Sequence, residues 1–266
     1  MNDIETINNN IKEHHETVKE KLRTAFSLTE DAASYEEIKT RLLDGGKVTG
    51  TNLCVLVCAM IIASVGLNVS STAVIIGAML ISPIMGSILA SAYGGVSGNY
   101  NQLRNNMIGF GIQIAISVCA ATVYFFLSPV KEPTVELLAR TSPSFFDILI
   151  AFFGGIAGII GQTRSDKTNT VIPGVAIATA LMPPLCTCGY SIANARWNML
   201  LGAGYLFIIN SYFIFLAACI ILSILKIPKN EELTEKQWKK FHLRMVRNTL
   251  IVAIPCIVGA YYYLML

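Results

Sequence analysis

The stretch GAMLISPIMGSILAS, residues 77–91, decides the fold because it places a proline in the middle of a long apolar segment. Pro83 removes a backbone donor, so the carbonyl of Met79 loses its helical partner. Small residues recur here at intervals of four: Ser82, Gly86, Ala90 and Gly94. This spacing places them on one helix face, where a neighbouring backbone can approach closely. The stretch predicts a membrane helix interrupted at Pro83.

The composition is that of an integral membrane protein. Hydrophobic residues make up 53% of the 266 residues and charged residues only 14%, and the mean hydropathy is +0.57. A soluble domain would carry about 25% charged residues. Apolar runs of about 20 residues, long enough to cross a bilayer, recur along the chain. They predict seven spans, at about 51–67, 71–95, 106–127, 145–162, 170–194, 198–225 and 246–266.

A second stretch, GVAIATALMPPLCTCG at 174–189, repeats the pattern of the first. VIIG at 74–77 and VIPG at 171–174 each begin an apolar segment that reaches a proline. Pro183 and Pro184 would free the carbonyls of Thr179 and Ala180. Spans one to three therefore resemble spans four to six, and copies with an odd number of crossings must be inverted. The expected fold is an all-α integral membrane protein of two inverted three-helix repeats plus a C-terminal helix.

The expected organisation follows from these spans. A cytoplasmic helical segment, with capping boxes at Ser27 and Ser34 and a stop at Gly45-Gly46, precedes the first repeat. The connector after the second repeat is basic and amphipathic and is expected to lie on the membrane surface. The segments are 1–50 (cytoplasmic), 51–127 (first repeat), 128–144 (external loop), 145–225 (second repeat), 226–245 (connector) and 246–266 (last helix).

Basic residues predict the orientation. With the N-terminus inside, seventeen Lys and Arg residues lie on the cytoplasmic side and three, Lys131, Arg140 and Arg196, lie outside. Seven spans then place the C-terminus outside. The small-residue helix faces would also allow association into a homo-oligomer, although no number of copies is specified.

The two interruptions are the expected binding site for a small solute or ion. An unpaired carbonyl in lipid costs several kcal/mol, so it persists only where a hydroxyl, a helix, water or an ion provides the partner. Hydroxyls and carbonyls suit a hard cation such as sodium, whereas half-helix N-termini suit an anion, and the residues do not choose between them. The candidates are Asn68, Met79, Ser82, Pro83, Gly86, Thr179, Ala180, Pro183 and Pro184.

A polar cluster at the expected inner ends of spans four and five is the candidate gate or entry. It comprises Gln162, Arg164, Asp166 and Asn169. A solvated cytoplasmic loop is the simpler interpretation of the same residues.

Several function classes are not expected. The chain contains no HExxH, G-x-S-x-G or Walker motif, so we expect no enzyme and no catalytic residues. Cys186 and Cys188 lack a third ligand, so no metal or other cofactor is predicted, and the cysteines are interpreted as packing residues. The first fifty residues hold seven basic and ten acidic residues, which argues against nucleic-acid binding.

Three stretches together resemble a bacterial and archaeal membrane family known as domain of unknown function 389. They are ASVGLNVSSTAVIIGAMLISPIMGSILA, LLARTSPSFFDILIAFFGGIAGIIG and NTVIPGVAIATALMPPLCTCGYSIA. Carried onto this sequence, the family's motif falls on Asn68, Gly77, Ser82, Pro83, Gly86, Pro173, Gly174, Pro183 and Pro184. Ser87 is a departure, because the family's motif commonly has proline there, and it leaves the first interruption with one proline.

The resemblance implies a multi-pass protein of the bacterial inner membrane whose activity is unassigned. The residues favour a secondary transporter or channel for a small solute or ion, working at the proline interruptions. The rival hypothesis is a membrane scaffold or sensor that transports nothing. In that case the prolines only shape packing, and the connector at 226–245 binds anionic lipid or a partner.

Overall fold

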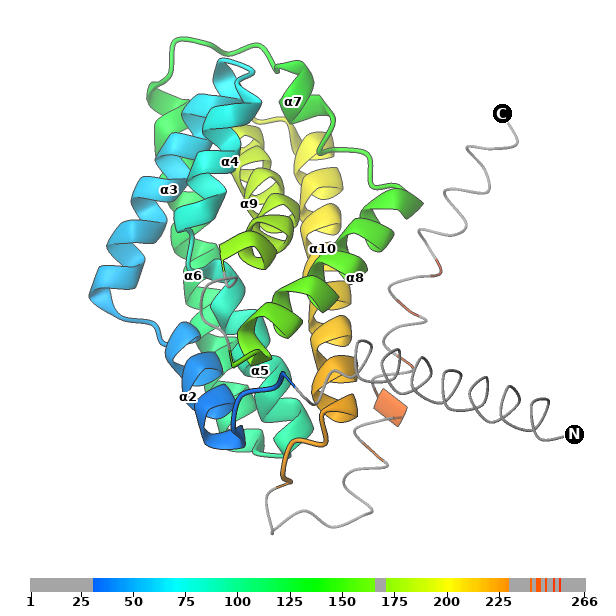
Figure 1. The fold of residues 1–266 in the computed structure, drawn as a ribbon. Helices are drawn as coiled ribbons and strands as arrows, with labels where there is room; N and C mark the ends of the chain where they lie inside the picture. Colours follow the sequence, from blue (N-terminus) through cyan, green and yellow to red (C-terminus); the bar gives the residue numbers. More distant parts are fainter. Residues whose placement is uncertain are drawn as a thin grey trace, which may run out of the picture.

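The computed structural model describes residues 31–165 and 171–229 and six isolated positions between 240 and 254; for 171–179 it describes the backbone alone. The first thirty residues, Asp166, Asn169, and most of the connector and of the expected seventh span lie outside this description. The described part is helical (Figure 1). Its helices are α2 (Tyr35–Gly45), α3 (Gly50–Asn68), α4 (Thr72–Ile81), α5 (Ile84–Ser97), α6 (Tyr100–Leu127), α7 (Val135–Leu138), α8 (Phe145–Thr163), α9 (Val171–Ala193) and α10 (Trp197–Ile224).

Local capping signals set several of these boundaries. The Ser34 hydroxyl accepts a hydrogen bond from the Glu37 amide at the start of α2, and the Gly46 amide closes its last turn. Ser144 and Asp147 form a reciprocal capping box at the start of α8. Both caps confirm the predicted starts of these helices.

Four described helices, α3, α6, α8 and α10, are each long and apolar enough to cross a membrane. The pair α4 and α5 passes the same test together, although the two helices meet at a bend of 48°. The described residues thus carry four membrane-spanning candidates, or five if the bent pair is one span. This count fits a helical membrane protein, whereas the seven-span inverted-repeat architecture stays a prediction.

Helix α9 lies at the centre of the bundle and contacts α3, α4, α5, α6, α8 and α10 (Figure 1). Its described side chains from Ala180 to Ser191 are buried without a break. The outer helices instead expose large apolar side chains, such as Phe126, Phe153 and Leu201. A core helix surrounded by helices with apolar outer faces is the arrangement expected in lipid.

Candidate functional site

The helix is broken at Pro83, as the sequence predicts. Helix α4 ends at Ile81 and α5 begins at Ile84, with Ser82 in an extended conformation (φ −76°, ψ 127°). The Ser82 amide donates to the Met79 carbonyl over 3.3 Å, and the Ile84 amide donates to the Ser82 hydroxyl over 3.5 Å. The carbonyl that proline deprives of its usual donor is thus paired within its own turn.

The second proline pair behaves differently, and the predicted interruption there is wrong. Helix α9 runs from Val171 to Ala193 with Pro183 and Pro184 inside it. The Ala180 carbonyl, which Pro184 leaves without its helical donor, accepts from Asn210 Nδ2 of α10 over 2.8 Å. A side chain of a neighbouring helix therefore replaces the missing amide, and α9 continues.

A cavity of about 310 Å³ lies against the break at Pro83. Helices α2, α3, α5 and α8 all contribute to its wall, and both signs of charge are present there. It is lined by Arg41, Leu42, Asp44, Gly45, Asn52, Ser82, Pro83, Met85, Gly86, Leu89 and Gln162. Three predicted binding residues, Ser82, Pro83 and Gly86, thus share one cavity with the predicted entry residue Gln162.

Helix α2 forms the polar side of this cavity because glycines let it lie directly on α5. Gly45 ends α2, and a Cβ atom added to Gly86 would collide with the Gly45 carbonyl group. One turn further along α5, a Cβ atom on Gly46 would collide with that of Ala90. The small-residue face predicted around Gly86 therefore receives the end of α2. Figure 1 shows α2 beside α5, at the end of the bundle where α6 begins.

Arg41 ties α2 to the end of α8. Its guanidinium donates to the Arg164 carbonyl over 2.5 Å and to the Gln162 carbonyl over 3.5 Å, and it pairs with Glu37 at 2.6 Å. Only 16% of the Arg41 side chain is exposed. Arg164 itself pairs with Asp31 at 3.3 Å. Arg164 therefore fastens chain segments together, and its side chain does not line the cavity.

We expect Arg41→Met to loosen α2 from α8. The substitution removes a charged donor from two backbone carbonyls, and such hydrogen bonds contribute about 1 to 3 kcal/mol. Protease protection of residues 35–46, measured in detergent, should fall clearly below that of the unaltered protein. Lys39→Met is the matched control, because among the described residues Lys39 forms its salt bridge with Glu36 of its own helix and is 45% exposed. Equal protection of the two variants would contradict the role given to Arg41.

The other predicted site residues do not line this cavity. Asn68 lies at the far end of α3, where its Nδ2 donates to Tyr124 Oη over 3.2 Å and to Ser128 Oγ over 2.8 Å. Ala180 lies in the core helix α9, while the side chain of Thr179 lies outside the described part. Asp166 and Asn169 of the predicted entry cluster also lie outside it.

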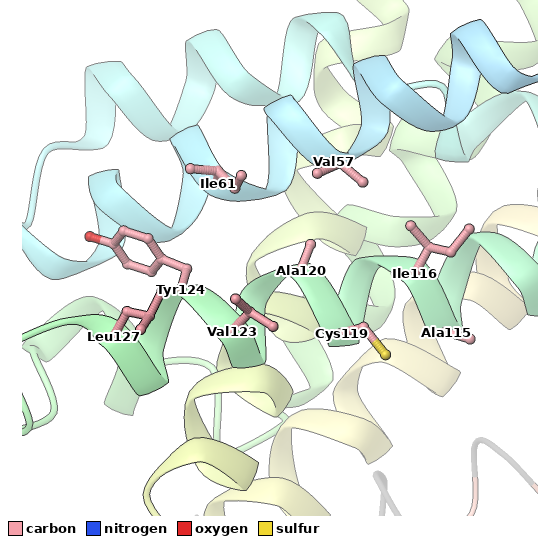
Figure 2. Close-up of a pocket in the computed structure, with 9 residues that line it drawn as sticks. All are labelled: Val57, Ile61, Ala115, Ile116, Cys119, Ala120, Val123, Tyr124 and Leu127. Carbon is pink, nitrogen blue, oxygen red and sulfur yellow. The ribbon is translucent and has the colours of Figure 1, made fainter.

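A larger groove of about 570 Å³ runs along the outside of α3 and α6 (Figure 2). Its walls are hydrocarbon, apart from the Cys119 thiol and the Tyr124 hydroxyl at one end. Side chains at its edges, such as Ile61 and Val123, are exposed. In a bilayer this surface faces acyl chains, so the groove offers nothing to position a polar solute.

Sequence reasoning missed the cavity residues contributed by α2 and α3: Arg41, Asp44 and Asn52. Arg41 carried one usable signal, since it lies one turn before the predicted helix stop at Gly45-Gly46. The contact between that stop and the small-residue face of α5 depends on tertiary packing, and no local pattern encodes it.

A match to the family described as "Domain of unknown function (DUF389)" covers residues 79–216, just over half of the chain. The chain belongs to this family. The DUF389 match contains Ser82, Pro83, Gly86 and Gln162 of the cavity, whereas Arg41, Asp44 and Asn52 precede it. The family description assigns no activity, so the function has to be argued from the site.

A curated relative comes from the archaeon Methanocaldococcus jannaschii, where it is named "Uncharacterized protein MJ0678". It is 25% identical over 221 residues, which cover 82% of this DUF389 chain and 68% of the relative. No solved structure matches the chain.

Proposed function

We propose that this DUF389 protein is a membrane transporter or channel for a small solute or ion, with its binding site at the break between α4 and α5. One observation carries the proposal: a cavity of about 310 Å³ with polar and charged lining touches the interrupted helix. Broken helices beside a polar cavity are the usual binding sites of secondary transporters. No enzymatic role and no cofactor enter this proposal.

The dimensions of the helices support two repeats of three spans. Helices α3 and α8 each have 19 residues, and α6 and α10 each have 28. Between them lie α4 with α5 in one half and α9 in the other. In the proposed mechanism the halves move relative to each other, and the break at Ser82-Pro83, which the regular helical hydrogen bonds do not bridge, acts as a hinge. The proposed setting is the bacterial inner membrane with the N-terminus inside.

Ser82 gives a direct test of access to the cavity. We expect a Ser82→Cys variant in liposomes to react with a membrane-impermeant charged thiol reagent, since a hydrated cavity exposes position 82 to water. Leu80→Cys is the matched control, because Leu80 is 48% exposed on the outer face of α4, where the reagent finds lipid. If both cysteine variants were labelled more than the unaltered protein, or if neither were, the result would contradict a water-filled cavity at the break.

Flux assays decide between transport and scaffolding. The purified protein is reconstituted in liposomes and tested with sodium, chloride, urea and glycerol. Flux above that of empty liposomes, lowered by Ser82→Ala, supports the proposal. Absence of flux for every probe, together with an unreactive position 82, favours the scaffold or sensor that transports nothing.

A further inference from the structure

Residues 97 positions apart correspond between α6 and α10. When the sequences of the two helices are aligned from Tyr100 and Trp197, six aligned residue pairs are identical, among them Phe110 with Phe207. In the same alignment Gln113 is aligned with Asn210. The backbone agrees, since Gly98 (φ 75°) and Ala195 (φ 52°) both adopt the left-handed conformation just before these helices. Helices α6 and α10, with the turns that precede them, therefore correspond to each other.

The two equivalent phenylalanines touch each other. The rings of Phe110 and Phe207 are stacked with centroids 6.0 Å apart and planes 23° apart, and each residue is 6% exposed. A contact between equivalent residues is what a two-fold axis produces. Figure 1 shows α6 and α10 running in opposite directions, as inverted halves require. The stacked pair thus marks where an axis relating α6 to α10 would pass.

A buried amide lies one turn beyond each phenylalanine. Gln113 is fully buried, and its Oε1 accepts from the Ser87 hydroxyl of α5 over 3.0 Å. Asn210 is 3% exposed, and its Nδ2 donates to the Ala180 carbonyl of α9 over 2.8 Å. Because α6 and α10 are antiparallel, the two amides lie on opposite sides of the phenylalanine pair along the bundle.

Each amide keeps one polar atom with no partner among the described residues. These atoms are Gln113 Nε2, a donor, and Asn210 Oδ1, an acceptor. The Ser117 hydroxyl, one turn beyond Gln113 and fully buried, has no partner either. A buried polar atom without a partner is destabilising by about 1 to 3 kcal/mol, and an apolar side chain in its place would avoid this. Unpaired atoms at equivalent positions therefore point to a ligand.

We propose that Gln113 and Asn210 are the two polar stations of a membrane-centred binding site for a small uncharged solute that both donates and accepts hydrogen bonds. This class of solute follows from the unpaired donor, Gln113 Nε2, and the unpaired acceptor, Asn210 Oδ1. An ion would meet no counter-charge, because no Asp, Glu, Lys or Arg occurs in 48–103, 105–130, 168–195 or 197–225. The cavity at Pro83 has one basic and one acidic lining residue, Arg41 and Asp44, and so does not select for charge.

The stacked phenylalanines separate the two stations. An apolar constriction blocks ions more strongly than an uncharged solute, because an ion loses far more hydration free energy on entering it. The solute passes from one amide to the other by displacing the rings of Phe110 and Phe207. This inference rests on the transport function proposed above; it adds a second binding site to the cavity at Pro83 and narrows the substrate class.

The test measures solute flux in liposomes by light scattering, with urea and glycerol as uncharged probes and sodium and chloride as ionic ones. Gln113→Met should lower urea or glycerol flux about tenfold, the effect of losing one hydrogen bond of about 1.4 kcal/mol. Asn101→Leu and Asn198→Leu are the matched controls, because these residues are also 97 apart on the same helices but are exposed. Both controls should keep the flux of the unaltered protein.

A double variant separates a binding role from a purely structural one at Asn210. In Asn210→Leu with Pro184→Ala, the new backbone amide at position 184 takes over the bond to the Ala180 carbonyl. If Asn210 binds solute, this variant regains the stability lost in Asn210→Leu but not the flux. Recovery of both the stability and the solute flux in this double variant would overturn the inference. Flux of ions alone would also overturn it, but would leave the proposed transport function intact. Absence of any flux in the unaltered protein would overturn both proposals.

Discussion

Gly86→Ala is expected to detach α2 from the bundle. The added Cβ atom would lie 3.1 Å from the Cα atom of Gly45 and closer still to its carbonyl group. Real Cβ atoms essentially never approach backbone so closely, and neither helix can yield by rotating a side chain. Overpacking of this kind costs about 1 to 3 kcal/mol, and this cost opposes the docking of the 11-residue helix α2 on α5.

Thermal unfolding in detergent and protease cleavage within residues 35–46 measure this effect. Gly77→Ala is the matched control: Gly77 is in α4, where an added Cβ atom meets no atom within 4 Å. Alanine there improves helix propensity by up to about 1 kcal/mol, so the control should be neutral or stabilising. Equal melting temperatures for the two variants, with α2 still protected, would show that Gly45 and Gly86 are not in contact.

Asn210→Leu is expected to lower the free energy of unfolding by about 1 to 3 kcal/mol. The substitution leaves the Ala180 carbonyl without a donor in the core helix, because Pro184 has no amide hydrogen to offer. Pro184→Ala alone should change stability little, since the carbonyl keeps its bond to Asn210. In the double variant the helical bond forms, and most of the loss should be recovered.

Equilibrium unfolding of the four proteins forms a double-mutant cycle. The expected result is strong coupling between positions 184 and 210, which lie on different helices. Additive effects would mean that the Ala180 carbonyl does not depend on Asn210. This measurement concerns stability alone, so it holds whether or not the protein transports anything.

Helix ends and caps could be predicted from sequence because their signals are local. Ser34 with Glu37, and Ser144 with Asp147, identify the starts of α2 and α8 within three residues of chain. The first proline was also predictable, since Ser82-Pro83 breaks its helix using atoms of neighbouring residues. Locally encoded structure needs no knowledge of the rest of the fold.

The second proline pair shows where such reasoning ends. Pro183 and Pro184 look like a stronger interruption than Pro83, yet α9 continues through them. Asn210, thirty residues after Ala180 in the sequence, donates to the Ala180 carbonyl. Gln113 and Asn210 did carry a signal, as amides in the middle of apolar segments. Their proposed equivalence depends on the stacked rings of Phe110 and Phe207, which lie on α6 and α10.

The segment before α3 is anchored to α5 and to α8 by contacts of different kinds. On α5 the Gly45–Gly86 contact is close packing, which weakens steeply as the two backbones separate. On α8 the anchors are hydrogen bonds: Arg41 to the Arg164 carbonyl, and the Ala33 amide to the Thr163 carbonyl at 2.8 Å. Water can replace these bonds one at a time. If the proposed halves move relative to each other, the contact between α2 and α8 should therefore open first, while α2 stays packed on α5.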